Sequence, residues 1–235
     1  MKKKLILIPS SLHESNGAKF LGKDTISEIY ECKSFIVERA KTARQFLKSI
    51  EFPHSFDDVR MLELNKHGED DIDEIFSLFD AGTVGLISDA GVPGVADPGG
   101  LLVRQAHAEG VDVRPLVGPS SLLLALMASG MNGQKFAFHG YLPKDEKELA
   151  QKLKSLERES KEADVTQMFI ETPYRNSKML KALFKILDGG TDLCIASNLT
   201  SPTQYIQTKT VGEWKQRIPD LGKNPTVFLV YGGKL

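Results

Sequence analysis

Short apolar runs of strand length alternate with helix-like segments through the first half of the chain. The apolar runs are residues 4–9, 34–38, 59–64, 83–88 and 111–117. Between them, the apolar residues of segment 70–82 recur at the spacing of one helix face, and segment 101–109 has helical spacing before Gly110. Strands that alternate with helices predict a mostly parallel, doubly wound sheet over residues 1–118.

The second half of the chain predicts a different kind of sheet. Its expected helices are residues 118–130, 144–163 and 177–187, and its expected strands are residues 135–143, 166–172, 192–197, 205–211 and 226–232. The connections between the last strands are short, so some of these strands must pair antiparallel. We therefore expect two α/β domains, residues 1–118 with the parallel sheet and residues 119–235 with a mixed sheet.

Composition narrows the class of protein only modestly. The formal net charge is −1, so contact with a nucleic acid requires a local basic surface rather than a global field. No apolar run has the length that a membrane span needs, and the five histidines lack metal-ligand spacing. Cys32 and Cys194 are isolated, which favours reduced thiols in a cytoplasmic protein. We expect neither a metal nor a membrane partner. Candidates for the basic surface are Lys2, Lys3, Lys4, Arg39, Lys41, Arg44 and Arg175.

The stretch ISDAGVPGVADPG, residues 87–99, is longer than a strand-to-helix connection needs. Its glycines allow backbone amides to approach a ligand closely, and Asp89 is a potential acceptor for hydroxyl or ammonium donors. The alternative interpretation is an ordinary connection built from common turn residues. The residues alone leave both interpretations open.

Two further connections carry candidate chemistry. In LVGPSS, residues 116–121, two serines open a helix, which suits a carboxylate or phosphate at the positive helix terminus; a simple capped helix start is the alternative. In TPYRN, residues 172–176, Tyr174 and Arg175 follow a strand and are candidates to face a substrate; a turn with a surface arginine is the alternative. In a parallel sheet, residues 87–99 and 116–121 should lie at the same edge.

The order of these motifs resembles a known family. A strand followed by SDAGVPGVADPG, then RPLVGPSSLLLALMASG, KFAFHGYLP and FIETPYR, is similar to the tetrapyrrole methylase superfamily of S-adenosylmethionine-dependent methyltransferases. The branch it resembles most methylates a cytidine ribose 2′-hydroxyl in 16S ribosomal RNA, and typically reads SDAGTP…SDPG, PGPSA, FxGFLP and ESPHR. The resemblance is strong over about residues 83–143 and looser over 166–232.

The resemblance implies a homodimer of two-domain subunits, with S-adenosylmethionine bound in the cleft between the domains. It assigns the donor site to Ser88, Asp89, Ala90, Gly91, Val92, Gly118, Ser120, Ser121, Thr172 and Asn198. Candidates to face the methyl acceptor are His139, Tyr174 and Arg175. No residue of the sequence is identified as a catalytic base.

Three segments depart from the family pattern. PSSLHES, residues 9–15, and VERAKT, residues 37–42, stand where the family usually has PTPIGN and AEDTR, and SNLTSPT, residues 197–203, replaces an RELTK-like stretch. We expect an S-adenosylmethionine-dependent methyltransferase acting on a ribose hydroxyl of RNA, with ribosomal RNA as the substrate class. The alternatives are methylation of a small heterocycle, or a family member with altered catalysis that serves as a ligand-binding or regulatory protein.

Overall fold

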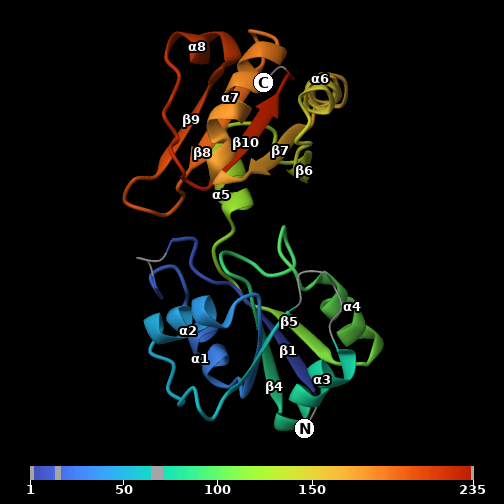
Figure 1. The fold of residues 1–235 in the computed structure, drawn as a ribbon, viewed down its shortest axis with the longest axis vertical. Coiled ribbons are helices and arrows are strands. Elements are labelled where there is room, and N and C mark those ends of the chain that lie inside the picture. The colour runs from blue at the N-terminus through green and yellow to red at the C-terminus, as the bar shows by residue number, and fades with distance from the viewer. Residues whose placement is uncertain (1–2, 14–16, 65–70, 234–235) are drawn as a thin grey trace. The chain divides into compact units, whose positions relative to one another are not determined.

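The computed structural model describes residues 3–13, 17–64 and 71–233. The chain forms two compact units, Met1–Ser120 (unit 1) and Ser121–Leu235 (unit 2). Each unit is an α/β structure with helices packed against a central sheet (Figure 1).

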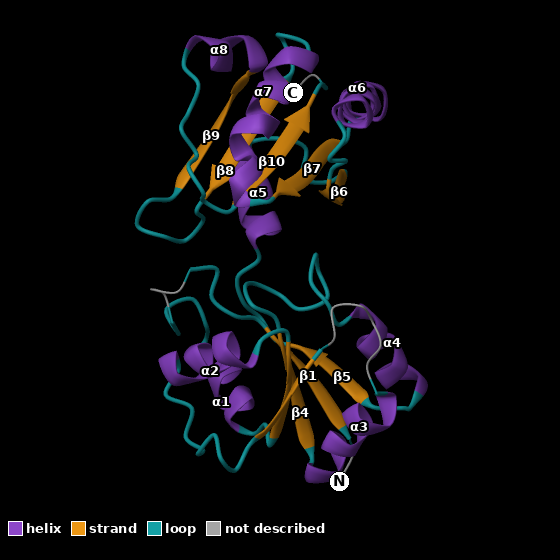
Figure 2. Cartoon of the chain, viewed as in Figure 1, coloured by secondary structure: helices purple, strands orange, loops and turns teal. Residues whose placement is uncertain are grey.

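Unit 1 contains a parallel five-stranded sheet, as the alternation of apolar runs predicted. The strand order is β3 (Arg60–Glu63), β2 (Ser34–Val37), β4 (Thr83–Ile87), β1 (Lys4–Ile8) and β5 (Asp112–Pro115). Every pairing between neighbours is parallel. The carboxyl ends of all five strands therefore lie at one edge of the sheet (Figure 2).

Helices cover both faces of this sheet. They are α1 (Lys23–Tyr30), α2 (Ala40–Ser49), α3 (Ile72–Ser77) with the 3₁₀ turn η2 (Leu78–Ala81), and α4 (Gly100–Ala108). Alternate residues of β1 divide between the two faces, because Ile6 packs with α1 and α2 whereas Leu5 packs with the other helices. Helices α1 and α2 were absent from the sequence prediction. The helix predicted over 70–82 begins at Ile72 and narrows to a 3₁₀ turn in its last residues, while its predicted start at residue 70 lies outside the described residues.

Unit 2 contains the expected mixed sheet. The strand order is β6 (Phe136–Tyr141), β7 (Thr166–Glu171), β10 (Thr226–Tyr231), β8 (Asp192–Ser197) and β9 (Tyr205–Thr210). Only the β6–β7 pair is parallel. The ends of β6, β7 and β8 therefore share one edge with the starts of β9 and β10.

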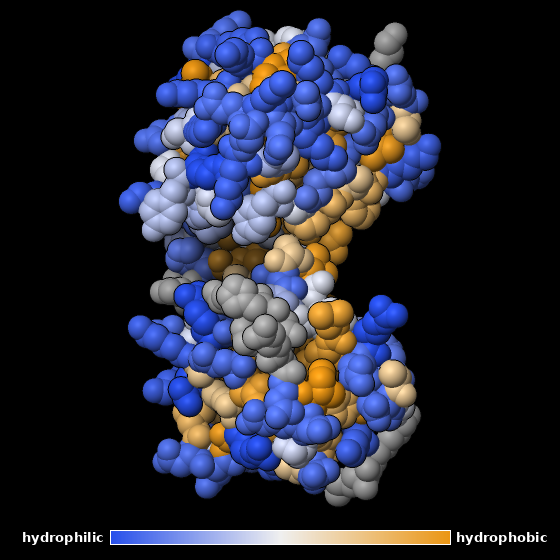
Figure 3. Space-filling view, turned by 45° about the vertical axis from the view of Figure 1, so that its right-hand side comes forward, coloured by the Kyte–Doolittle hydropathy of each residue, from blue (hydrophilic) through white to orange (hydrophobic). Residues whose placement is uncertain are grey.

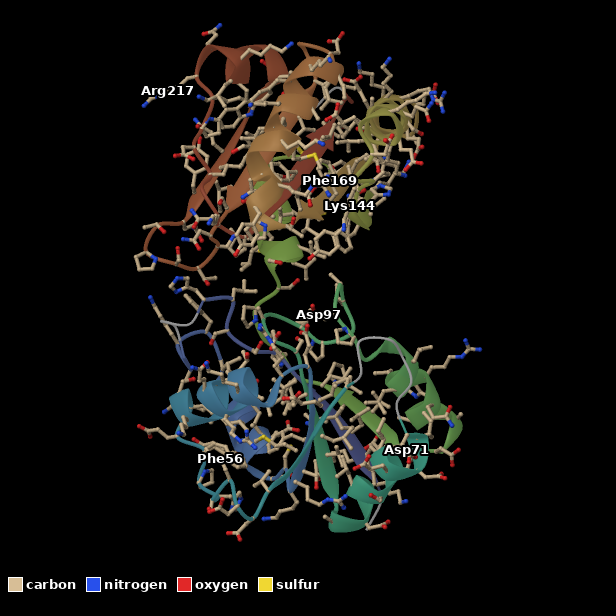
Figure 4. The ribbon with its side chains drawn as sticks, in the orientation of Figure 1. Phe56, Asp71, Asp97, Lys144, Phe169 and Arg217 are labelled. Atoms are coloured by element: carbon tan, nitrogen blue, oxygen red, sulfur yellow. The ribbon has the colours of Figure 1, made fainter. Side chains whose placement is uncertain are left out.

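The helices of unit 2 are α5 (Ser121–Ser129), α6 (Glu146–Ala163), α7 (Asn176–Ile186) and α8 (Val211–Gln216), with the 3₁₀ turn η3 (Pro173–Arg175). Helix α8 begins where the sequence predicted the last residue of a strand, because Thr210 and Glu213 form a capping box. One face of the sheet buries Phe169, which Figure 4 labels, together with Trp214. The indole Nε1 of Trp214 donates to the Leu193 carbonyl at 2.8 Å, which anchors α8 to the sheet.

Three structural findings bear on the class of protein. Within the described residues, no helix is long and apolar enough to cross a membrane. The same residues hold no group of three or more histidine, cysteine or acidic side chains able to bind a metal ion. Both Cys32 and Cys194 are buried free thiols, and burial raises the pKa of Cys32 to about 12, so this thiol is unreactive at neutral pH.

Candidate functional site

The connections that follow β1, β4 and β5 meet at the carboxyl edge of the unit 1 sheet. The Ser10 N–H donates to the Gly91 carbonyl at 2.8 Å, and the Gly91 N–H donates back to the Ser10 carbonyl at 3.3 Å. The Ser10 hydroxyl also donates to the Ser88 carbonyl at 3.0 Å. These bonds hold the first residues of the 87–99 connection against the end of β1.

Glycine is required at two places in this arrangement. Gly91 has φ +78°, a left-handed conformation that residues with side chains rarely adopt, and a Cβ there would lie 3.2 Å from the Leu12 side chain. A Cβ at Gly118 would lie 2.2 Å from the Pro9 ring, far inside contact distance. The connection that contains Gly118 therefore packs directly on the one that follows β1, which agrees with the shared edge expected from the sequence.

Asp89 is the charged residue at the centre of this edge. Its Oδ2 accepts a hydrogen bond from Arg39 Nε at 2.6 Å, and its backbone N–H donates to Glu38 Oε2 at 3.2 Å. Its side chain is only 18 % exposed, whereas Arg39 is 61 % exposed. Asp89 Oδ1 is buried and has no hydrogen-bond partner among the described residues. A buried carboxylate oxygen without a partner is a position at which a ligand donor would bind favourably.

Acidic groups gather around Asp89. Burial, together with the negative charges of Glu38 and Asp89, raises the pKa of Asp97 to about 6, against the opposing effect of the Ser88 hydroxyl. Asp97 lies on the connection above the sheet (Figure 4). With Arg39 as the cation paired to Asp89, this edge favours a ligand that carries positive charge.

A cavity of about 480 Å³ opens beside Asp89. It lies between the connection after β1 and helix α2, and its volume falls within the range of small-molecule sites. Its lining residues are Ser10, Ser11, Leu12, Arg39, Thr42, Gln45, Phe46, Ser49, Asp89 and Ala90. Two of the segments that depart from the family pattern, 9–15 and 37–42, therefore contribute lining residues to this cavity. Residues 14 and 15 of the first segment lie outside the described residues.

In unit 2, Thr172 and Asn198 lie on either side of the start of β10. The Thr172 N–H and hydroxyl donate to Glu171 Oε1 at 2.7 and 3.2 Å. The Asn198 N–H donates to the Pro225 carbonyl at 2.8 Å, and its side-chain amide donates to the Thr203 hydroxyl. Asn198 adopts φ +54°, so part of its role is to shape the turn after β8.

The acceptor-facing candidates differ in how firmly they are held. His139 Nε2 lies 2.6 Å from Gln167 Oε1. Arg175 forms an ion pair with Glu171 at 3.3 Å. Tyr174 is 79 % exposed, with Lys223 Nζ 4.9 Å from its ring centre. Of the three side chains, Tyr174 has the most surface available to a substrate.

Ser120 and Ser121 stand at the boundary of the two units, at the last residue of unit 1 and the first of unit 2. Ser121 is the first residue of α5, so Ser120 occupies the N-cap position. Within the described residues, neither serine hydroxyl makes a hydrogen bond with another group of the protein. Val92 is half-buried next to Gly91.

Sequence reasoning did not assign to these edges four residues that shape them: Glu38, Arg39, Asp97 and Glu171; of the four it named only Arg39, as a candidate for a basic surface. The first two directly follow strand β2, whose carboxyl end lies at the same edge as Asp89. Since the alternation of strands predicted that common edge, these polar residues after β2 carried a usable signal. Glu171 could not be identified as a site residue from the sequence, because a single carboxylate at the last position of a strand forms no recognisable motif.

Comparison with known proteins places this fold and these motifs among methylases. The family model described as tetrapyrrole (corrin/porphyrin) methylases matches residues 26–215. The crystal structure of the methyltransferase CobJ superposes with a TM-score of 0.60, covering 97 % of this chain and 93 % of that one at 18 % identity. At that identity the likeness supports a common fold.

Curated relatives are more similar in sequence. "Ribosomal RNA small subunit methyltransferase I" of Vibrio cholerae is 35 % identical over 153 residues, 64 % of this chain and 52 % of the relative. The protein of the same name from Xylella fastidiosa is 37 % identical over 182 residues, 73 % of this chain and 63 % of the relative. The protein of the same name from Escherichia coli is 31 % identical over 181 residues, which cover 75 % of this chain and 62 % of the relative. The chain thus spans between half and two thirds of the length of these relatives.

Proposed function

Because this chain belongs to the tetrapyrrole (corrin/porphyrin) methylase family, we propose that it is a methyltransferase that uses S-adenosylmethionine and methylates a ribose hydroxyl of small-subunit ribosomal RNA. The observation that carries the proposal is the edge of unit 1, where three connections meet and where Asp89 Oδ1 is buried with no partner among the described residues. The names of the curated relatives support the choice of RNA over a small heterocycle as the acceptor.

The residues at this edge fit the methyl donor. S-adenosylmethionine has ribose hydroxyls, an ammonium group and a cationic sulfonium, all of which suit a carboxylate acceptor and an acidic surrounding. Asp89 supplies the carboxylate oxygen, and Ala90, Gly91 and Val92 supply backbone groups that a glycine-rich connection leaves accessible. In unit 2, Thr172 and Asn198 supply polar groups at the corresponding strand ends.

When bound, S-adenosylmethionine would supply an electrophilic methyl group, which an acceptor oxygen would take in line as the carbon–sulfur bond breaks and S-adenosylhomocysteine leaves. The protein's own residues orient the two reactants and exclude water around them. A hydroxyl acceptor must also lose a proton. Asp97 is our candidate for that task, because it lies on the same connection as Asp89, close enough to interact with it electrostatically, and its pKa is raised to about 6. Glu38 and Asp89, whose charges raise that pKa, thereby increase the basicity of Asp97.

We also propose that the protein is a homodimer and that it acts in the cytoplasm. Large apolar side chains lie exposed on unit 2, including Leu123 and Met127 of α5 and Phe136 and Tyr141 of the edge strand β6. Figure 3 shows orange, apolar surface that interrupts the blue polar surface of the units. Light scattering after size exclusion measures the dimer directly.

The proposed location in the cytoplasm is supported by the two buried free thiols, which suit a reducing compartment.

The proposal is tested by incubating the protein with methyl-labelled S-adenosylmethionine and either small-subunit ribosomal RNA or intact small subunits. Nuclease digestion followed by mass spectrometry should locate the label on a ribose. Labelling of a porphyrin-like heterocycle, with none in RNA, would assign the protein to the small-molecule alternative. Donor binding without transfer to any acceptor would favour the ligand-binding alternative.

A further inference from the structure

Unit 2 contains a cavity of about 550 Å³ whose lining includes none of the donor-site candidates, although one of them, Asn198, donates to its lining residue Thr203. We call it the β9–α8 pocket, because strand β9, helix α8 and the connection from α8 to β10 form its walls. Its lining residues are Ser197, Thr203, Tyr205, Gln207, Lys209, Trp214, Arg217, Ile218, Pro219, Asp220, Leu221 and Asn224. Tyr205, Gln207 and Lys209 alternate along β9, so they share one face of the strand.

Two cations border this pocket and form no ion pair in the described part of the chain, although the charge of Lys209 also acts on the nearby Glu213 carboxylate. Lys209 Nζ lies 5.0 Å from the centre of the Trp214 ring, and within the described residues it makes no ion pair. Arg217 is exposed, projects outward from unit 2 (Figure 4), and also lacks an ion pair in that part of the chain. The one acidic lining residue, Asp220, accepts the Gly222 N–H at 2.9 Å and so is partly held by its own turn. Both cations are therefore available to an anionic ligand.

The remaining polar lining suits a heteroaromatic ring. Tyr205 is half-buried, and its hydroxyl donates to Gln207 Oε1 at 2.8 Å, which fixes the orientation of its ring. Burial raises the pKa of Tyr205, and the positive charge of Arg217 opposes that rise, which indicates that Arg217 acts on the ring's hydroxyl. The side-chain amide of Asn224 makes no hydrogen bond within the described residues. It can therefore donate to or accept from the edge of a base.

We propose that the β9–α8 pocket binds one nucleotide of a single-stranded RNA segment, with its phosphate at Lys209 and Arg217 and its base near Tyr205 and Asn224. The pocket volume accommodates a nucleotide. Aromatic rings, guanidinium groups and amides are the groups by which proteins recognise unstacked RNA bases. This inference rests on the proposed function, since it takes RNA as the methyl acceptor.

A path leads from this pocket toward the candidate donor residues of unit 2. Lys223 precedes Asn224 in the chain, and its Nζ lies over the ring of the exposed Tyr174. Tyr174 follows Thr172 by two residues. A strand of RNA bound in the pocket therefore meets a further cation and a further exposed ring before it reaches the end of β7.

Trp214 makes the pocket directly observable, because it is the single tryptophan of the chain and Lys209 lies over its ring. The probes are hexacytidylate RNA and cytidine 5′-monophosphate, titrated into the full chain while tryptophan fluorescence is recorded. A phosphate that draws Lys209 away from the indole should change the emission. The measurement needs neither methyl donor nor turnover.

The variant to compare is Lys209→Gln combined with Arg217→Gln. We expect it to weaken binding of hexacytidylate at least tenfold and to lower the slope of log affinity against log salt by about 0.7, the value for one phosphate contact on a single strand. The control is Lys215→Gln, which removes an exposed lysine of helix α8 that does not line the pocket, and which should change affinity less than twofold. Thermal melting checks that every variant is folded.

Unchanged RNA affinity and salt slope in the folded double variant would overturn this inference. Methyl transfer to ribosomal RNA by the wild-type protein, measured in parallel, separates this failure from failure of the proposed function. If transfer persists in that case, only the pocket assignment is wrong. If transfer is absent but hexacytidylate still changes Trp214 emission in a Lys209-dependent way, the pocket assignment stands and the proposed reaction is wrong.

Discussion

Replacing Asp89 by asparagine tests the donor site with the least change in shape. The substitution removes the charge of the carboxylate whose Oδ1 is buried without a partner and whose Oδ2 pairs with Arg39. Hydrogen bonds to a charged group contribute about 1.5–3 kcal/mol. At about 1.4 kcal/mol for each factor of ten, the Kd for S-adenosylmethionine should rise by about tenfold to 150-fold. Isothermal titration calorimetry measures this change.

The fold should be much less affected by Asp89→Asn. The ion pair with Arg39 is largely solvent-exposed on the arginine side, and such pairs contribute about 0–1 kcal/mol. Loss of the negative charge also relieves repulsion with Asp97, so the melting temperature without ligand should change little. Arg39→Gln is the matched control, because it removes the pair but keeps the carboxylate and should leave donor affinity unchanged or higher. Unchanged donor affinity with a loss of stability of about 2 kcal/mol or more would refute the reasoning and make Asp89 a structural turn residue.

Three further predictions concern stability. Asp97 has a raised pKa in the folded state, so its ionisation lowers the free energy of unfolding as pH increases from about 4 through 6. Asp97→Asn should therefore raise the free energy of unfolding on the order of 1 kcal/mol at pH 8, after discounting for partial exposure, and change it little at pH 4; urea unfolding at both pH values measures this. Gly118→Ala should cost about 1–3 kcal/mol because the new Cβ overlaps the Pro9 ring, and an unchanged melting temperature would contradict the contact. Arg175→Ala should destabilise unit 2 by about 1–3 kcal/mol because it leaves the buried Glu171 carboxylate without its cation; a fully stable variant would mean that Arg175 is free to face a substrate.

The fold was predictable where apolar periodicity was strong. Every strand of both sheets begins within one residue of its predicted start, because each is a short apolar run bounded by turn residues. Helix α2 was missed although Ala43, Phe46, Leu47 and Ile50 recur at helical spacing, since its polar majority and the absence of a side-chain N-cap obscured its start. Helix α8 was missed because a six-residue helix is too short for its period to be read, and its capping box was the usable signal.

The candidate site was predictable only in part, for a physical reason. Glycine and turn residues after β4 and β5 predicted the converging connections, because parallel topology places strand ends together. Parallel topology also predicts that residues after β2 lie at this edge, but it does not predict that they pair with Asp89. Glu38 and Arg39 reach it across neighbouring strands, and such pairing depends on strand order, which the sequence left open. Whether the donor lies between the two domains remains a prediction of the resemblance.

The most direct test of the central claim uses S-adenosylmethionine with a trideuterated methyl group and small-subunit ribosomal RNA. After complete digestion to nucleosides, mass spectrometry distinguishes a label on the ribose from a label on the base. The account predicts a trideuteromethyl group on a ribose 2′-oxygen, formed by the wild-type protein and strongly reduced by Asp89→Asn at limiting donor. A label on a base, or no label in RNA although the donor is bound, would contradict it.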